Sequence, residues 1–229
     1  MKKLLLTLSM VLTLGLSVAG VSAQSEGVQA PDFDDLETEL DVEGLRSVYS
    51  RTYSMDIEEL MADPDFDFEE MDISAMIRSV SIQGMAFEND DAASAYLEEM
   101  KTELEATLEE NPESLEGAEV SDLDSLDING VRVSMDMPEM EMFVTMSLFV
   151  TDSHVFQVSV IDTDADTAHS LTDGVIQYIL DAEVESDDVT FSEDGTSTGG
   201  VYDRMPGTDN DLVADLTSLT DAEIFLADE

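Results

Sequence analysis

Apolar residues recur at helical spacing in two separate segments of the chain. In residues 89–110, Asn89 or Asp90 is placed to cap the first turn, and Asn111-Pro112 is placed to end the helix. The second segment covers residues 164–183. Both patterns predict amphipathic helices, whose stripes contain Ala93, Tyr96, Leu97, Met100, Leu104 and Leu108 in the first and Leu171, Val175, Ile176, Ile179 and Leu180 in the second.

Shorter apolar runs with partial alternation predict β-strands around these helices. Residues 45–55 and 76–87 form two such runs, and Gly84 marks an expected bulge in the second. Asn129-Gly130 is typical of a two-residue type I′ hairpin turn, so a further strand is expected to begin at Val131.

A second turn, at Pro138-Glu139, predicts the register of the next hairpin. It aligns apolar residues on one face of both strands, and a one-residue slip would scramble them. The predicted pairs are Met137–Met140, Met135–Met142, Val133–Val144 and Val131–Met146. A three-residue loop, residues 152–154, would extend this face into another strand that contains Phe156, Val158 and Val160.

These elements predict an α+β fold. We expect an antiparallel sheet of about five to six strands with two helices packed on one face, because both stripes need the same apolar surface. Residues 24–44 are an expected acidic linker, residues 45–190 the α+β domain, and residues 191–229 an acidic C-terminal tail rich in Gly, Ser and Thr.

Residues 1–23 have the three parts of a Sec signal peptide. Lys2 and Lys3 supply the positive charge, an apolar run follows, and small residues stand at Val21-Ser22-Ala23. Cleavage is expected between Ala23 and Gln24. The alternative is a membrane anchor, which the short apolar run and the acidic sequence after it disfavour. We therefore expect a secreted or extracytoplasmic protein.

The chain is strongly acidic. Its 229 residues include 55 Asp and Glu against 8 Lys and Arg, a formal net charge of −47. Such a surface repels nucleic-acid phosphates and anionic membranes, so neither is an expected partner. A cation, a cationic protein or a small-molecule ligand stays open as a partner. The chain has no cysteine, which excludes disulfides, thiolate metal sites and a cysteine nucleophile.

The distribution of acidic residues along the chain indicates the salt concentration in which the protein works. Acidic residues occur along the whole chain, including the segments expected to fold, and Lys101 is the one lysine after the predicted cleavage site. Both features are typical of proteins that work in concentrated salt, where screening weakens self-repulsion. The alternative is an ordinary acidic secreted protein with a disordered tail. We expect a halophile-type protein that folds poorly without salt.

Asp162, Asp164, Asp166 and Asp173 follow an EF-hand-like spacing, with Ser170 between the last two. Calcium favours oxygen ligands of this kind. However, Thr167 replaces the usual glycine, Asp173 replaces the usual glutamate, and no helix precedes the loop. The alternative is that these acids form the N-terminus of the second helix, where the helix dipole favours them. Calcium is the one candidate cofactor, and the alternative interpretation needs none.

Five methionines lie close together in the expected hairpin. Thioethers are soft ligands that bind Cu(I), and His154 is nearby in sequence. The alternative is that methionine replaces leucine as a flexible filler of the core. We favour the core interpretation, because the predicted register puts these residues on the face of Val131, Val133 and Val144. The five are Met135, Met137, Met140, Met142 and Met146.

No catalytic motif is recognisable in the sequence. His154 and His169 are the two histidines, and no known motif places a serine or a further ligand beside either. Catalytic carboxylate pairs cannot be singled out among 55 acids. The sequence therefore favours a non-catalytic binding or interaction module. A calcium-binding protein is the first alternative, and an exported hydrolase is the second.

Overall fold

The computed structural model describes residues 42–54, 77–110, 117–123, 126–138, 140–184, 190–191, 197–207, 210–213 and 218–225. Its elements, in chain order, are β1 (Leu45–Ser54), β2 (Ser79–Phe87), α5 (Asp90–Glu110), β3 (Ala118–Asp122), β4 (Gly130–Met137), β5 (Met142–Thr151), β6 (His154–Asp162), α6 (Ala165–Asp181), β7 (Thr190–Phe191), β8 (Ser197–Thr198), the 3₁₀ helix η2 (Gly200–Arg204) and β9 (Ser218–Phe225).

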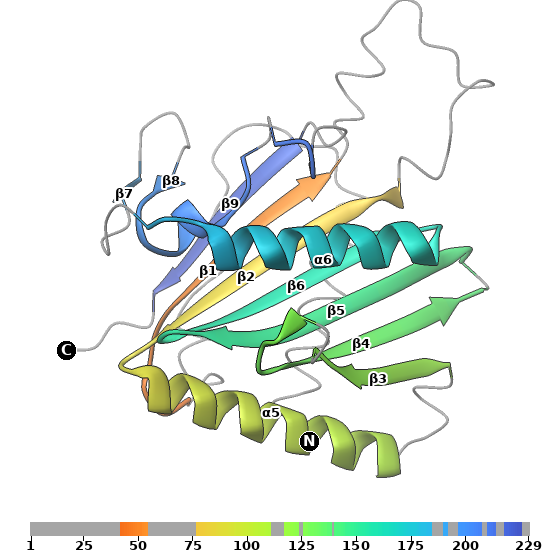
Figure 1. The fold of residues 1–229 in the computed structure, drawn as a ribbon, viewed down its shortest axis with the longest axis horizontal. Helices are drawn as coiled ribbons and strands as arrows, with labels where there is room; N and C mark the ends of the chain where they lie inside the picture. Colours follow the sequence, from red (N-terminus) through yellow and green to blue (C-terminus); the bar gives the residue numbers. More distant parts are fainter. Residues whose placement is uncertain are drawn as a thin grey trace, which may run out of the picture.

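Seven of the strands form one sheet in the order β3-β4-β5-β6-β2-β1-β9 (Figure 1). Every neighbouring pair is antiparallel. β7 and β8 pair with each other in a separate two-stranded sheet. The central strands β2 and β6 lead directly into α5 and α6. The predicted α+β fold, with an antiparallel sheet and two helices, is confirmed.

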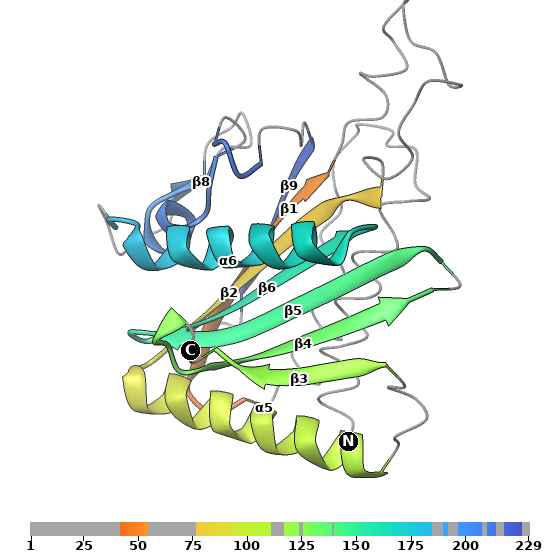
Figure 2. The same cartoon turned by 45° about the vertical axis from the view of Figure 1, so that its right-hand side comes forward.

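The two helices lie on opposite faces of the sheet (Figure 2), whereas the sequence predicted both on one face. Phe149 of β5 packs in the core beneath α6, and its neighbour Leu148 packs in the core beneath α5. Successive side chains of a strand point to opposite faces, so the sheet separates the two cores. The sheet is therefore covered on both sides, and each helix has an apolar surface of its own.

Each core is built from one helix and the strand residues below it. The α6-side core includes Tyr53, Ile82, Phe149, Phe156, Ile176 and Ile179. The α5-side core includes Leu45, Met85, Phe87, Leu97, Met100 and Leu104. Full burial of one such side chain contributes about 1.5–3 kcal/mol, so both faces add to stability.

The pairing of β4 with β5 is shifted by two residues from the predicted register. Met137 lies opposite Met142, and Val133 lies opposite Met146. The connection uses residues 138–141, and Glu141 adopts a left-handed conformation with φ 51°. A shift by two keeps every side chain on its predicted face. The predicted register was wrong, but the sharing of one face by these methionines and Val133 is retained.

A two-residue turn, Asp152-Ser153, joins β5 to β6, in place of the predicted three-residue loop. Thr151 lies opposite His154, and Asp152 adopts φ 50°. A three-residue loop is needed only if β5 and β6 bury a single face. Both faces are buried, and Phe149 stacks on Phe156 on the α6 side with ring centroids 5.8 Å apart.

Gly130 begins a strand and does not form the predicted two-residue turn. The connection from β3 to β4 ends at Asn129, and Asp127 within it has a positive φ, 57°. A Cβ on Gly130 would lie 2.7 Å from the carbonyl oxygen of Leu148. Glycine is therefore required here by close packing against β5.

The segment around η2 closes one end of the α6-side core. Val201 and Tyr202 are buried, and the Tyr53 hydroxyl donates to the carbonyl of Pro206 at 2.6 Å. A Cβ on Gly84 would lie 2.1 Å from Cγ2 of Val201, so Gly84 permits this contact. It forms no bulge, because it pairs in continuous register with Tyr49 of β1 and Phe156 of β6, and the irregularity of the β1–β2 pair lies in β1, between Leu45 and Ser47.

Part of the predicted C-terminal tail therefore belongs to the core and the sheet. β9 pairs with β1 along its length, so residues after 191 contribute to the fold. The domain boundary at residue 191 stays a prediction.

The predicted helices agree with α5 and α6 within two residues at each end. Asn89 caps α5, since its Oδ1 accepts the Ala92 N–H at 3.0 Å. The predicted signal peptide and nearly all of the predicted linker lie outside the described residues. Within the described part of the chain, no helix has the length and apolar character needed to cross a membrane.

Candidate functional site

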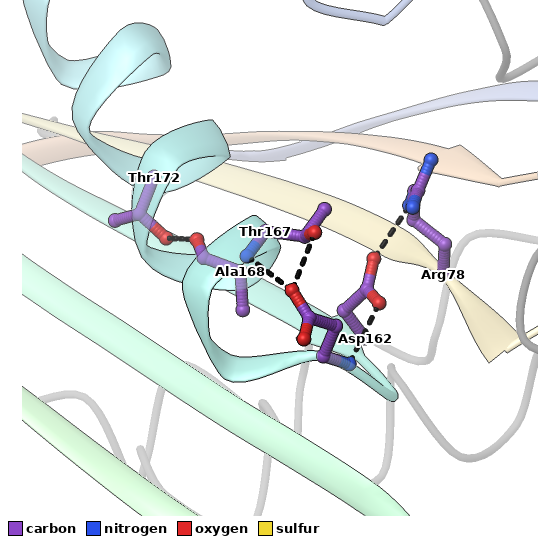
Figure 3. A network of polar contacts seen from close by, with 6 residues as sticks. Arg78, Asp162, Thr167, Ala168 and Thr172 are labelled. Atoms are coloured by element: carbon purple, nitrogen blue, oxygen red, sulfur yellow. Dashed lines mark hydrogen bonds and ion pairs between the residues drawn. The ribbon is translucent and has the colours of Figure 1, made fainter.

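The predicted calcium ligands lie where β6 turns into α6. Asp162, the last residue of β6, is 1% exposed. Its Oδ2 accepts the Nε–H of Arg78 at 2.5 Å, and its Oδ1 accepts the backbone N–H of Asp164 at 3.0 Å (Figure 3). Both oxygens of this carboxylate are thus engaged by protein groups. The ion pair with Arg78 compensates for the free-energy cost of burying the charge of Asp162.

Asp164 is the N-cap of α6. Its Oδ1 accepts the Thr167 hydroxyl at 2.7 Å and the Thr167 N–H at 2.8 Å. These two hydrogen bonds, with the side-chain bond the stronger influence, hold the pKa of Asp164 below its ordinary value. The side chain therefore acts as a helix cap, as the second interpretation of this acidic segment predicted.

The four predicted ligands do not converge on one point. Asp166 lies in the first turn of α6, whereas Asp173 forms an ion pair with Arg132 of β4. Among the described residues, no group of three or more His, Asp or Glu side chains is placed to hold a metal ion. The geometry lends no support to the predicted calcium site, which stays a prediction.

A second group of polar side chains lies between α6 and the strands β4 and β5. We call it the α6 polar cluster. The Oγ of Ser134 is 2.9 Å from Nε2 of His169, and the ring of His169 meets Phe143 edge-on with centroids 5.2 Å apart. The cluster consists of Arg132, Ser134, Ser147, His169 and Asp173.

Arg132 links the two strands and the helix within this cluster. Its Nε donates to Oγ of Ser147 at 3.0 Å, and its Nη2 donates to Oδ1 of Asp173. Ser134 is 7% exposed and Ser147 is fully buried. Each of these polar groups has a partner within the protein, as buried polar groups require. The cluster holds α6 to the outer half of the sheet.

The contact between Ser134 and His169 cannot be predicted from the sequence. The alternation of Arg132 and Ser134 with apolar neighbours in β4 was a visible signal that a polar face exists. The helix residue that meets this face lies 35 positions further along the chain. No local pattern connects residues so far apart. His154, the other histidine, begins β6 and lies against Phe156 with centroids 6.1 Å apart.

Two further arginines, Arg51 and Arg204, also bind within the protein. Arg51 is 6% exposed, and its guanidinium lies 4.8 Å from the ring centroid of Tyr202. Arg204 donates to Asp152 at 2.9 Å and to the carbonyl of Ile179 at 3.2 Å, near the C-terminus of α6.

Lys101 also binds to groups within the protein. It donates to Oδ1 of Asn129 at 2.8 Å and lies 3.7 Å from a carboxylate oxygen of Glu98. These basic side chains thus connect different elements of the fold.

Comparisons with known proteins do not identify the chain. No protein-family model matches it, and no curated protein matches it significantly. Among solved structures it is similar to the extracellular domain of PknH from Mycobacterium tuberculosis, with 12% identity over 42% of this chain and a TM-score of 0.29. The match spans about half, 53%, of that structure. A TM-score this low establishes neither a shared fold nor a shared function.

Proposed function

We propose that this protein is an exported, halophile-type domain that acts as a non-catalytic binding or interaction module. The inward placement of its basic side chains carries the proposal. Six Lys and Arg residues follow residue 23. Five of them have partners within the protein, and none of the five is more than 26% exposed. The five are Arg51, Arg78, Lys101, Arg132 and Arg204.

This placement leaves the outer surface to the carboxylates. Self-repulsion among them is large at low ionic strength, because the Debye length is about 8 Å at 0.15 M salt and about 3 Å at 1 M. Concentrated salt therefore favours the compact state, and a dense shell of carboxylates keeps the surface hydrated. The charge pattern and the predicted signal peptide together support work outside the cell in brine.

The polar groups of the α6 polar cluster favour a binding role over catalysis, because they are already bound to one another. Ser134 and Ser147 are buried, and His169 and Arg132 bind neighbouring protein groups. These contacts use the polar groups within the fold, where they hold α6 to the sheet. Partners of the anionic surface are expected to be cationic, and in molar salt they need short-range contacts, because long-range attraction is screened.

The test is the salt dependence of folding. Far-UV circular dichroism of the chain from Gln24 onward is expected to show a cooperative gain of sheet signal as NaCl rises from about 0.05 M to about 3 M. Sucrose is the control, since it favours compact states without screening charge. A signal that is already complete at low salt, or an equal response to sucrose, would contradict the proposal.

Export is tested separately, by sequencing the N-terminus of the protein recovered from the medium of the native host. A mature chain that begins at Gln24 is expected. Retention of residues 1–23 in the cell fraction would contradict the export part of the proposal and leave the salt adaptation standing.

One contact favours a second candidate function, an exported hydrolase. In that function the Oγ of Ser134 would be the nucleophile and His169 the general base, since a serine hydroxyl needs an adjacent base. Their 2.9 Å separation is compatible with this role. Turnover of an activated ester that disappears in both S134A and H169Q would support hydrolysis. Turnover that is absent, or equal in the wild type and S134A, would exclude it.

A further inference from the structure

Three methionines lie together at the end of the β4–β5 hairpin. Met137 is directly opposite Met142, and Met135 is the next residue of β4 on the same face. Opposite residues have Cβ atoms about 4.5–5.5 Å apart, and diagonal neighbours lie about 7–8 Å apart. Side chains as long and flexible as methionine can bring three sulfur atoms together across these distances. We call these residues the methionine triad.

The methionine triad is not part of either apolar core. Its three side chains are half-buried, and none of them belongs to the described α5-side or α6-side core. Val131 and Val133, on the same strand and face, do belong to the α5-side core, as do Met85 and Met100. The predicted role of core filler is therefore met by Met85 and Met100 and by Met146, which packs against the same core. It is not met by the triad or by Met140, which is exposed.

We propose that the methionine triad binds a soft monovalent cation, Cu(I). Thioether sulfur is a soft, uncharged ligand that favours Cu(I), whereas Ca²⁺ and Mg²⁺ favour oxygen. Three neutral ligands leave the ion with its positive charge. Exposed carboxylates lie nearby, Glu141 in the hairpin turn and Asp136 on the opposite face of β4, and their negative potential favours a cation at this end of the hairpin. Binding involves no electron transfer, and the site does not depend on the proposed function of the domain.

The experiment is an anaerobic titration of the full chain with Cu(I) against a chromophoric Cu(I) chelator. Molar sodium sulfate supplies the ionic strength, because chloride would itself bind Cu(I). The test variant is M135L/M137L/M142L, and the matched control is M85L/M100L, which replaces two buried methionines. Leucine nearly conserves the volume of methionine, so both variants are expected to fold.

The wild type and M85L/M100L are expected to bind one Cu(I) with equal affinity. Loss of a residue that only orients a metal ligand already costs about 10- to 100-fold in affinity, so the triad variant should lose at least that much. Equal affinity of the wild type and the triad variant would overturn the proposal. An equal loss in M85L/M100L would do the same, because it would place the effect in the core.

A measurement on the wild type keeps the proposal testable if the triad variant fails to fold. Silver(I) is a redox-inert substitute for Cu(I), and the methyl groups of ¹³C-labelled methionine report on the sulfur beside them. The signals of Met135, Met137 and Met142 are expected to shift with one equivalent of Ag(I), and those of Met85 and Met100 to stay in place. Shifts of all five, or of none, would contradict the proposed site.

Discussion

Asp162 is the one acidic side chain that is buried among the described residues. Its carboxylate joins two elements, since it accepts from Arg78 before β2 and from the backbone at the start of α6. In D162N the neutral amide cannot balance the positive charge of the Arg78 guanidinium, and one acceptor oxygen is lost. Removing one member of a buried ion pair costs about 3–5 kcal/mol, and the partial exposure of Arg78 lowers the expected cost to about 2–4 kcal/mol.

Urea denaturation of D162N in molar salt measures this loss. D166N is the matched control, because Asp166 is exposed in the first turn of α6, close to Asp162 in sequence, and changes at exposed positions usually stay within about 0.5 kcal/mol. Equal stability of D162N and D166N would show that the ion pair contributes nothing.

Asp164 makes the stability of α6 depend on pH. Hydrogen bonds from Thr167 lower the pKa of the folded carboxylate, so its contribution is complete above the unfolded pKa and is lost as the pH falls through the folded pKa. D164A is expected to be less stable than the wild type at pH 7, with a difference that shrinks as the pH is lowered through the acidic range.

The matched variant for this position is D164S, because serine caps a helix but does not titrate there. Its stability relative to D164A should be independent of pH, as measured by thermal unfolding at a series of pH values. A wild-type advantage that persists unchanged at the acidic end would contradict the role of the ionised cap.

At the scale of elements, the two helices stabilise the fold from separate cores. Leu97 of α5 and Ile176 of α6 are both fully buried, and the sheet lies between them. L97A is expected to cost about 2–5 kcal/mol and I176V about 0.5–1.5 kcal/mol. Because the two residues share no core, the double variant should equal the sum of the singles within about 0.5 kcal/mol.

Denaturant unfolding in molar salt measures these values. F149L and F156L form the control pair, since these rings stack on each other and should deviate from additivity. Strong coupling between L97A and I176V would instead indicate helices that pack together on one face.

At the scale of the whole molecule, charge density sets the salt needed for folding. Glu105, Glu119, Asp136 and Glu141 are exposed on three different elements and one loop. Replacing all four by their amides, in E105Q/E119Q/D136N/E141Q, removes repulsion from the compact state. The NaCl concentration at the midpoint of folding is expected to fall.

The charge-conserving control is E105D/E119D/D136E/E141D, whose midpoint should stay near that of the wild type. Circular dichroism during salt titration compares the three proteins. Equal midpoints for the amide variant and the wild type would show that screening of surface charge does not govern folding.

The candidate sites show the limit of inference from local patterns. The spacing of Asp162, Asp164 and Asp166 suggested metal ligands, but hydrogen bonds of a helix start account for the first two. The methionines stand out in the sequence, and alternation places them on one face. The position of the methionine triad outside the core cannot be read from this pattern, because it depends on how far α5 extends over the sheet.

By itself, the sequence determined the α+β class, the bounds of both helices and the face on which the hairpin side chains lie. These follow from repeats of 3.6 and 2 residues, which act over a few neighbours. The tertiary structure decided which face each helix covers, the two-residue shift of β4 against β5, and the meeting of Ser134 with His169. A helix can pack on either face of a strand that is apolar on both faces. A shift of the strand register by two residues leaves every side chain on the same face. Only packing across the whole sheet distinguishes such alternatives.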